Sequence, residues 1–139
     1  DSRVLDVVVS GLYSSVGLDE PPTTGEALAA RRALRSFGLA SRAGRTLAVL
    51  SYGQARRVMF ARAAVASPEL LLLDEPFAGV DAATRRALRR GVEALVAAGT
   101  AVVMASHHRD EWPDNASHEL ELEAGRARYV GPMRGRPGR

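Results

Sequence analysis

The run ELLLLDE, residues 69–75, constrains the fold of this chain more than any other stretch. Four consecutive leucines do not alternate between core and solvent, so the run is typical of a strand buried on both faces, as in a parallel sheet. A second run of this kind, TAVVMAS, covers residues 100–106. Between them an amphipathic helix is predicted to begin after Asp81 and to end before Gly99. Strand, helix and strand in this order predict a right-handed βαβ crossover and an α/β fold.

Helices are predicted before this unit, and a hairpin after it. The three helices each begin at a polar residue and cover residues 2–12, 23–37 and 51–67. Ser2 is the expected cap of the first, and Thr23 with Glu26 has the spacing of a capping box. Residues 118–131 alternate as two short strands joined near Gly125, which predicts a β-hairpin. This sheet is too small for so much apolar surface, so we expect a partner chain or a larger domain to complete it.

The composition excludes several classes of protein. The chain has 139 residues, enough for one domain, and its 46% apolar and 25% charged residues are typical of globular proteins. No apolar run approaches the roughly 18 residues of a membrane helix, and the first residues do not resemble a secretory signal. Cysteine is absent, which excludes disulfides and thiolate metal sites and favours the cytoplasm.

The positive charges of the chain are all arginine. The sequence has 19 arginines and no lysine, so the lysine of a phosphate-binding P-loop is not among these residues. The net charge of +3 is small, and most of the arginines are distributed along the predicted helices. We therefore expect no direct binding to nucleic acid.

Side chains that could do chemistry follow both predicted strands. Asp74 and Glu75 end the first strand, and His107 follows the second. Because the carboxyl ends of parallel strands share one edge of a sheet, where α/β proteins bind ligands, the three should lie close together. An acid at the end of an apolar strand can hold Mg²⁺, and a second acid can polarise a water molecule. Taken singly, the two acids are explained almost equally well as solvated residues before a proline turn, and His107 is better explained as a solvent-facing turn residue.

The segment LSYGQ, residues 50–54, begins the third predicted helix. Ser51 can cap this helix, while the free N–H groups at its start attract anions. Gly53 would let a phosphate approach the backbone, and Gln54 offers an amide donor. Such a segment is usually an ordinary helix start, and Asp81 alone is best explained as the N-cap of the following helix.

In their order along the chain, these segments resemble the C-terminal half of an ABC ATPase, of the ATP-binding cassette family. The motifs are LSYGQ, LLLLDEP, AGVD and SH, all within residues 50–107. The resemblance implies a nucleotide-binding signature, made by Ser51, Tyr52, Gly53 and Gln54, and a nucleotide-binding D-loop at Asp81. It also implies that Asp74 is the Walker B metal ligand, Glu75 the catalytic carboxylate and His107 the switch histidine. In this family two cassettes dimerise head to tail, and each signature closes over ATP held by the Walker A motif of the other.

The sequence departs from the family pattern in two ways. Tyr52 stands where the family usually has glycine, which resembles the second cassette of tandem ABC proteins of the ModF, or photorepair, kind. No glycine-rich loop with lysine is present, so the chain resembles part of a P-loop cassette domain that lacks the Walker A half. By this resemblance residues 1–67 are the helical subdomain and signature helix. Residues 68–139 carry Walker B, the D-loop, the switch histidine and the C-terminal hairpin.

The resemblance implies ATP and Mg²⁺ as cofactors and ATP hydrolysis as the reaction. The expected protein is a subunit of an ABC importer for molybdate or another anion or metal-related solute. Its expected partners are a second cassette and a membrane permease, which would hold it at the cytoplasmic face of the inner membrane. In this family the permease docks on the helical subdomain, here Val4 to Leu47. Alone, the chain is expected neither to bind ATP tightly nor to hydrolyse it.

Two other functions remain open at this point. One is a soluble ABC ATPase that acts on a macromolecule, which the absence of an adjacent permease gene would favour. The other is a non-catalytic module that lends only its signature to a complete cassette. Replacing Glu75 with glutamine distinguishes this module from an ATPase, because only an ATPase would lose turnover.

Overall fold

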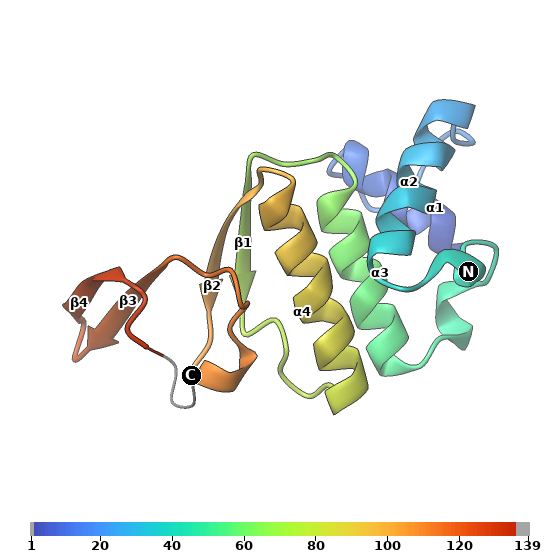
Figure 1. Cartoon of the computed structure of the whole chain (residues 1–139). Helices are drawn as coiled ribbons and strands as arrows, with labels where there is room; N and C mark the ends of the chain where they lie inside the picture. Colours follow the sequence, from blue (N-terminus) through green and yellow to red (C-terminus); the bar gives the residue numbers. More distant parts are fainter. Residues whose placement is uncertain (1, 136–139) are drawn as a thin grey trace.

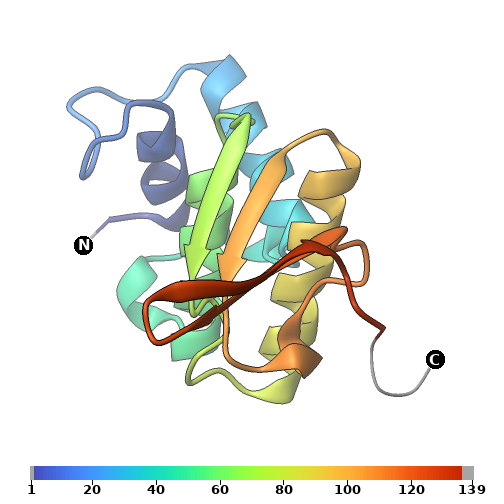
Figure 2. The ribbon, with the colours of Figure 1, turned by 90° about the vertical axis from the view of Figure 1, so that its left-hand side faces the viewer.

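The predicted βαβ unit is present (Figure 1). In the computed structural model, which describes residues 2–135, β1 (Leu70–Asp74) and β2 (Ala101–Ala105) are parallel neighbours. Leu70 pairs with Ala101 and Asp74 with Ala105, so the two strands end at the same edge. Helix α4 (Ala82–Ala97) connects them, and Figure 2 shows the helices behind one face of the strand pair.

Both predicted ends of α4 are confirmed. The side chain of Asp81 accepts a hydrogen bond from the N–H of Thr84 at 2.8 Å, which satisfies one of the free donors of the first turn. After the helix, Gly99 takes a φ of 103°, a conformation that side chains disfavour and that ends the helix. Leu88 and Val92 are buried on the predicted apolar face.

The first predicted helix is shorter than expected and begins differently. It consists of α1 (Val4–Val9) and a following 3₁₀ turn, η1 (Ser10–Leu12). The prediction that Ser2 caps it is wrong, because Arg3 is the N-cap and makes no side-chain capping bond. The N–H groups of the first turn are satisfied by backbone instead: Val4 donates to the carbonyl of Arg45 at 2.8 Å. Backbone hydrogen bonds to a segment distant in the sequence thus replace a local side-chain cap.

The other two helices begin as predicted. Helix α2 (Thr24–Ser36) has the expected capping box between Thr23 and Glu26. Helix α3 (Tyr52–Ala64) begins at Ser51, which forms a second capping box with Gln54. Short 3₁₀ turns complete the helical part of the chain: η2 (Ala40–Arg42), η3 (Leu47–Val49) and η4 (Arg109–Glu111).

One buried apolar cluster joins the four helices. It includes Val8 of α1, Leu34 of α2, Val58 of α3 and Leu88 of α4. Phe37, also fully buried, packs against α4 at Gly91, where an added Cβ would lie 2.2 Å from the phenyl ring. The absence of a side chain at this glycine lets α4 approach the aromatic core.

The predicted C-terminal hairpin is confirmed. Strands β3 (His118–Glu123) and β4 (Arg126–Pro132) are antiparallel and joined by Ala124 and Gly125, whose φ values are 49° and 75°. Positive φ at both residues is the geometry of a tight two-residue hairpin. Among the described residues the hairpin is a separate two-stranded sheet, and in Figure 2 it crosses in front of the ends of β1 and β2.

The prediction that β1 is buried on both faces is wrong for the described chain. Leu71 is only 8% exposed, whereas Leu70 and Leu72 are 52% and 69% exposed. In β2, Val103 is 60% exposed. The helices cover one face of the strand pair, and the hairpin crosses the other face only near the strand ends, so Leu70, Leu72 and Val103 remain exposed. The exposed leucines agree with the expectation that this sheet is too small to be complete.

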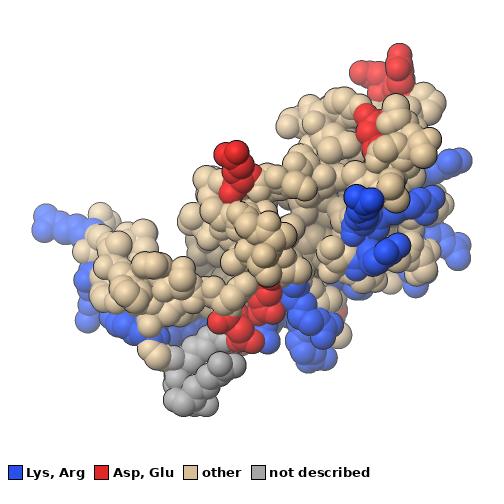
Figure 3. All heavy atoms as spheres, turned by 45° about the horizontal axis from the view of Figure 1, so that its top comes forward, with Lys and Arg blue, Asp and Glu red and all other residues tan. Residues whose placement is uncertain are grey.

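The arginines are spread over the molecule. In Figure 3 they occur at both ends and along the lower edge of the view, separated by uncharged surface and by a group of acidic residues. Within residues 2–135, no helix combines the length and the hydropathy that crossing a bilayer requires.

Candidate functional site

The ends of β1 and β2 bring an acid and an imidazole into contact. Glu75 Oε1 lies 2.7 Å from Nδ1 of His107, so the predicted proximity of these residues is confirmed. Asp74, the last residue of β1, immediately precedes Glu75 and is exposed. The parallel register explains the contact, because it ends both strands at the same edge. We call Asp74, Glu75 and His107 the strand-end cluster.

The two partners shift each other's protonation. The hydrogen bond from His107 lowers the pKa of Glu75 below its ordinary 4.5, and the same bond raises the pKa of His107 above 6.5. Their side chains are 38% and 70% exposed, so solvent screens the attraction and the pair adds little to stability. Its effect is chemical: Glu75 is kept as a carboxylate, and Nδ1 of His107 is kept as a donor.

The backbone of Glu75 has an unusual conformation. Its φ of 41° is left-handed, which is uncommon for a residue with a side chain. Its N–H donates to the carbonyl of Ala105 at 2.9 Å. Arg56 of α3 donates to the carbonyls of Glu75 and Pro76 at 3.5 and 3.4 Å. The turn that carries the carboxylate is therefore held from both β2 and α3.

The start of α3 is arranged as a reciprocal cap. Ser51 Oγ accepts from the N–H of Gln54 at 3.3 Å, and Gln54 Oε1 accepts from the N–H of Ser51 at 3.1 Å. These bonds satisfy donors that a ligand could otherwise use. The Ser51 hydroxyl proton and the Gln54 amide N–H groups do not take part in this cap. Both residues keep donors for a ligand at this helix start.

Gly53 has a packing reason that the sequence did not indicate. A Cβ at this position would lie 2.5 Å from Oγ1 of Thr84, which is 6% exposed at the start of α4. A side chain here would force Thr84 or the two helices to shift, because real Cβ atoms do not approach other atoms so closely. Glycine is thus required for α3 to approach α4, independently of any phosphate.

Tyr52 precedes Gly53 at the start of α3, and Asp81 is the N-cap of α4, whose first turn contains Thr84. Tyr52 is 64% exposed, and a Cβ on Gly79 would be 3.8 Å from its hydroxyl, so its ring lies beside the turn that follows β1. Asp81 accepts two hydrogen bonds from Thr84, one from the N–H and one from the hydroxyl, both 2.8 Å. These bonds lower the pKa of Asp81 below 3.8. The expected N-cap role of Asp81 is confirmed.

The strand-end cluster suits Mg²⁺ better than a metal ion whose ligands all come from protein side chains. No group of three or more His, Cys, Asp or Glu side chains converges as a metal site within residues 2–135. Mg²⁺ usually takes one or two carboxylates and completes its octahedron with water and substrate phosphates. Asp74 is exposed and supplies such a carboxylate.

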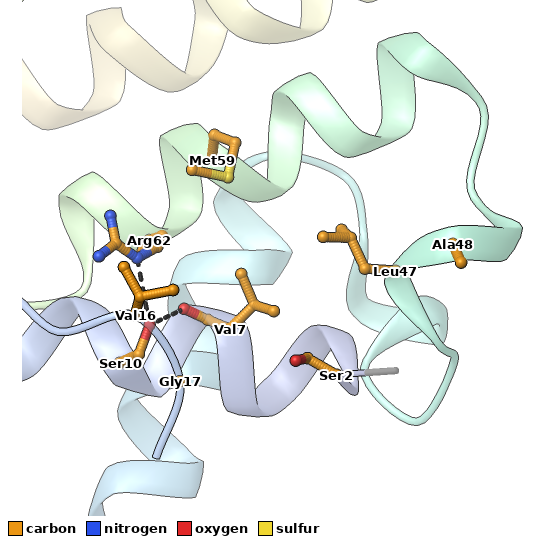
Figure 4. Close-up of a pocket in the computed structure, with 9 residues that line it drawn as sticks. All are labelled: Ser2, Val7, Ser10, Val16, Gly17, Leu47, Ala48, Met59 and Arg62. Carbon is orange, nitrogen blue, oxygen red and sulfur yellow. Dashed lines mark hydrogen bonds between the residues drawn. The ribbon is translucent and has the colours of Figure 1, made fainter.

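A surface pocket of about 500 Å³ lies elsewhere, in the helical part (Figure 4). Its lining comes from α1, α3, η1, η3 and the segments beside them: Ser2, Val7, Ser10, Val16, Gly17, Leu47, Ala48, Met59 and Arg62. Arg62 closes one side, donating to Ser10 Oγ at 3.1 Å and to the carbonyl of Ser15 at 2.8 Å. Val16 is fully exposed and Met59 is 45% exposed. The pocket shares no residue with the strand-end cluster.

Comparison with known proteins identifies this arrangement. A family model described as ABC transporter matches residues 12–78, which contain both the α3 start and the end of β1. The chain matches part of an ABC transporter ATP-binding cassette. The chain is 34% identical over 133 residues to the ABC transporter ATP-binding protein ModF of Escherichia coli K12. This match covers 93% of the chain and 27% of the relative. It is also 40% identical over 103 residues to the manganese transport system ATP-binding protein MntB of Bacillus subtilis 168. This match covers 74% of the chain and 41% of the relative.

The fold agrees with the sequence matches. A solved ABC transporter, assigned to the metal-chelate type and inward-facing, superposes with a TM-score of 0.79 and 26% identity. The superposition covers 94% of the chain described here and 52% of the solved one. The chain therefore spans about half of the solved chain, about a quarter of ModF and about two fifths of MntB.

Several residues around the cluster were not predicted from the sequence. Arg56 and Thr84 act through backbone carbonyls and close packing, which residue patterns do not reveal. Glu111 is 2% exposed and accepts a hydrogen bond from Ser106 Oγ at 2.8 Å. Its one sequence signal is an acid four residues after His107, in a segment otherwise typical of a loop.

Proposed function

We propose that this chain is part of the ATP-binding and ATP-hydrolysing subunit of an ABC importer. The observation that carries the proposal is the hydrogen bond between Glu75 and His107, beside Asp74, at the carboxyl end of two parallel strands. Nucleotide hydrolases need a metal ligand, a group that polarises water and a donor for phosphate oxygens. The strand-end cluster offers one residue of each kind.

Asp74 is the proposed Mg²⁺ ligand. It is exposed at the end of β1, and the ion would complete its coordination with phosphate oxygens and water. When bound, Mg²⁺ would neutralise charge on the phosphates of ATP. Asp74 would bind the Mg²⁺ ion that contacts the ATP phosphates, while its neighbour Glu75 faces the attacking water.

Glu75 is the proposed general base, and His107 the proposed γ-phosphate donor. The lowered pKa of Glu75 keeps it ionised, so a free carboxylate oxygen can accept a proton from the attacking water. Nδ1 of His107 donates to Glu75, and in the protonated imidazolium, which the raised pKa of His107 favours, Nε2–H can also donate to a phosphate oxygen. One imidazole would then link the base to the phosphate that is attacked.

We propose that the start of α3 binds a nucleotide held by a second cassette. The residues involved would be Ser51, Tyr52, Gly53 and Gln54, with Asp81 beside them. The start of α3 is exposed at Ser51 and Tyr52, and both Ser51 and Gln54 keep donors beyond their cap. The chain contains no lysine for a phosphate-binding loop, so this site depends on residues outside the sequence in hand. We expect the 139-residue chain alone neither to bind ATP tightly nor to hydrolyse it.

The transported solute is proposed to be a metal ion or an oxyanion such as molybdate. Support comes from the relatives, one named for manganese transport and one named ModF, and from Tyr52, which favours a ModF-like second cassette. We propose that residues 1–67 form the helical subdomain and signature helix, and residues 68–139 the part with the strand-end cluster. The subunit would work at the cytoplasmic face of the inner membrane.

A membrane permease is the second proposed partner. Its docking site would be the pocket of Figure 4, in the region from Val4 to Leu47 and the facing part of α3. The exposed apolar side chains of Val16 and Met59 at this pocket suit a protein contact.

The test is Glu75→Gln in the assembled transporter, with Glu69→Gln as the control. Glu69 is exposed and precedes β1, at the opposite end of the strand from the cluster. Loss of a general base should lower kcat by about 10²–10⁴-fold while ATP still binds. Glu69→Gln should keep the parent kcat. Unchanged turnover in Glu75→Gln would leave the chain as a module that lends only its α3 start to a complete cassette.

A further inference from the structure

Glu111 is a buried acid that the proposed mechanism does not use. It lies in η4, four residues after His107, and is 2% exposed. Carboxylates are rarely buried unless both oxygens have partners. Here Oε2 accepts from Ser106 Oγ at 2.8 Å, and Oε1 lies 3.6 Å from Nε of Arg85 on α4. The acid therefore ties the end of β2 to α4.

The partners of Glu111 lie on both sides of His107. Ser106 precedes the histidine, and its Oγ also accepts from the N–H of His108 at 3.1 Å. The N–H of Glu111 donates to the carbonyl of His108 at 3.1 Å. Ser106 is thus bound to the buried carboxylate, and His108 is bound to Ser106 and to the backbone N–H of Glu111.

His107 itself is not fixed by burial. Its side chain is 70% exposed, and its ring contacts Glu75 and the ring of His108, whose centroid is 3.9 Å away. Exposed pairs are screened by solvent and do not by themselves hold two side chains in one geometry. A hydrogen bond to a buried carboxylate is screened far less and is stronger than a neutral one.

We infer that Glu111 is a positioning residue, which acts through Ser106 to hold the imidazole of His107 against Glu75. Arg85 supplies the countercharge that allows Glu111 to be buried; it also lies 3.6 Å from Asp110. The inference rests on the proposed function only for its effect on ATP turnover. The position of the imidazole can be measured in the chain without nucleotide.

The first test measures which nitrogen of His107 carries the proton. In nitrogen-15 NMR spectra of the full 139-residue chain, recorded where the imidazole is neutral, the bond to Glu75 should favour the Nδ1–H tautomer. Ser106→Ala should lose this preference, and Ser106→Thr, which keeps a hydroxyl, should retain it. His107→Gln assigns the signal. If Ser106→Ala is unfolded by amide dispersion, Ser106→Cys replaces it, since the thiol fills the space but is a weak donor.

A double-mutant comparison tests the route through Ser106. Glu111→Gln should reduce the Nδ1–H tautomer in the parent chain and change nothing further in Ser106→Ala, because the two residues act in series. A folded Ser106→Ala or Ser106→Cys chain with the parent tautomer would overturn the inference. An additional effect of Glu111→Gln in the Ser106→Ala background would also overturn it, since Glu111 would then act by another route.

The second test uses the assembled transporter. Positioning partners of reacting groups are worth about 10–100-fold in activity, so Ser106→Ala should lower kcat by about tenfold with KM for ATP unchanged. Ser106→Thr should restore the parent kcat. If the tautomer changes and kcat does not, the positioning stands and the proposed role of His107 in hydrolysis is wrong. If kcat falls and the tautomer does not change, Glu111 does not position His107.

Discussion

Glu75 and His107 are 32 residues apart in the sequence, and their side chains meet at 2.7 Å between Oε1 and Nδ1. The contact exists because β1 and β2 are parallel and in a register that ends both strands at one edge. The left-handed backbone of Glu75, held by Ala105 and Arg56, belongs to the same turn. The pair is therefore a property of the strand pair and its turn rather than of either residue alone.

The Glu75–His107 pair should make stability depend on pH in a defined window. The pKa of His107 is raised, so its contribution is complete below 6.5 and is lost as pH rises through the folded-state pKa. The pKa of Glu75 is lowered, so its contribution is complete above 4.5 and is lost as pH falls through the folded-state pKa. Both contributions are complete between pH 4.5 and 6.5. The destabilisation caused by His107→Gln, measured by urea unfolding, should be largest in that window.

The control for this pH dependence is the same substitution in a Glu75→Gln chain. Without the carboxylate, the effect of His107→Gln on the free energy of unfolding should lose its dependence on pH across the window. A dependence that persists would assign it to another neighbour of the imidazole, such as Glu111, which also raises the pKa of His107.

Gly53→Ala should destabilise the chain by about 1–3 kcal/mol, the usual cost of forcing extra volume into a packed contact. The added Cβ would meet Oγ1 of Thr84 at 2.5 Å. Combined with Thr84→Ala, the substitution should cost less than the sum of the two single effects, because the obstructing atoms are gone. Gly25→Ala on α2 is the control, since nothing lies within 4 Å of its added Cβ. Strict additivity of Gly53→Ala and Thr84→Ala in urea unfolding would contradict the packing explanation.

Leu71 and Leu72 should respond very differently to the same truncation. Leu71 is 8% exposed and Leu72 is 69% exposed. In the isolated chain Leu71→Ala should cost about 2–5 kcal/mol, as expected for a buried leucine. Leu72→Ala should stay within about 0.5 kcal/mol of the parent, as expected for a surface position. In a complete cassette, Leu72→Ala should become costly if additional strands cover that face. Equal costs in the isolated chain would show that self-association covers it, which sedimentation can detect.

Met59→Glu should weaken binding to the permease if the pocket of Figure 4 is the docking site. A charge at this apolar rim should reduce affinity by about tenfold, which corresponds to about 1.4 kcal/mol. Val130→Glu on the hairpin is the matched control, since Val130 is 71% exposed and lies outside the pocket. Copurification with the permease measures both. Equal binding of the two variants would move the docking surface away from this pocket.

Local sequence patterns predicted most of the elements and their ends. Thr23 with Glu26 and Ser51 with Gln54 form capping boxes because each pair satisfies its own backbone donors, without help from distant residues. Asp81 and Gly99 likewise bound α4 by local geometry. The strand order and the shared edge also followed from the sequence, since a βαβ crossover has one common hand.

Tertiary structure decided what depends on distant partners. Ser2 does not cap α1, because the backbone at Arg45 supplies that partner. Gly53 is explained by Thr84, and the exposure of Leu72 by the absence of a second layer in the described chain. The sequence by itself determined that Asp74, Glu75 and His107 follow two neighbouring strands. Only the folded chain joined Glu75 to His107 and attached Ser106 to the buried Glu111, because hydrogen bonds between side chains need relative positions that periodicity does not contain.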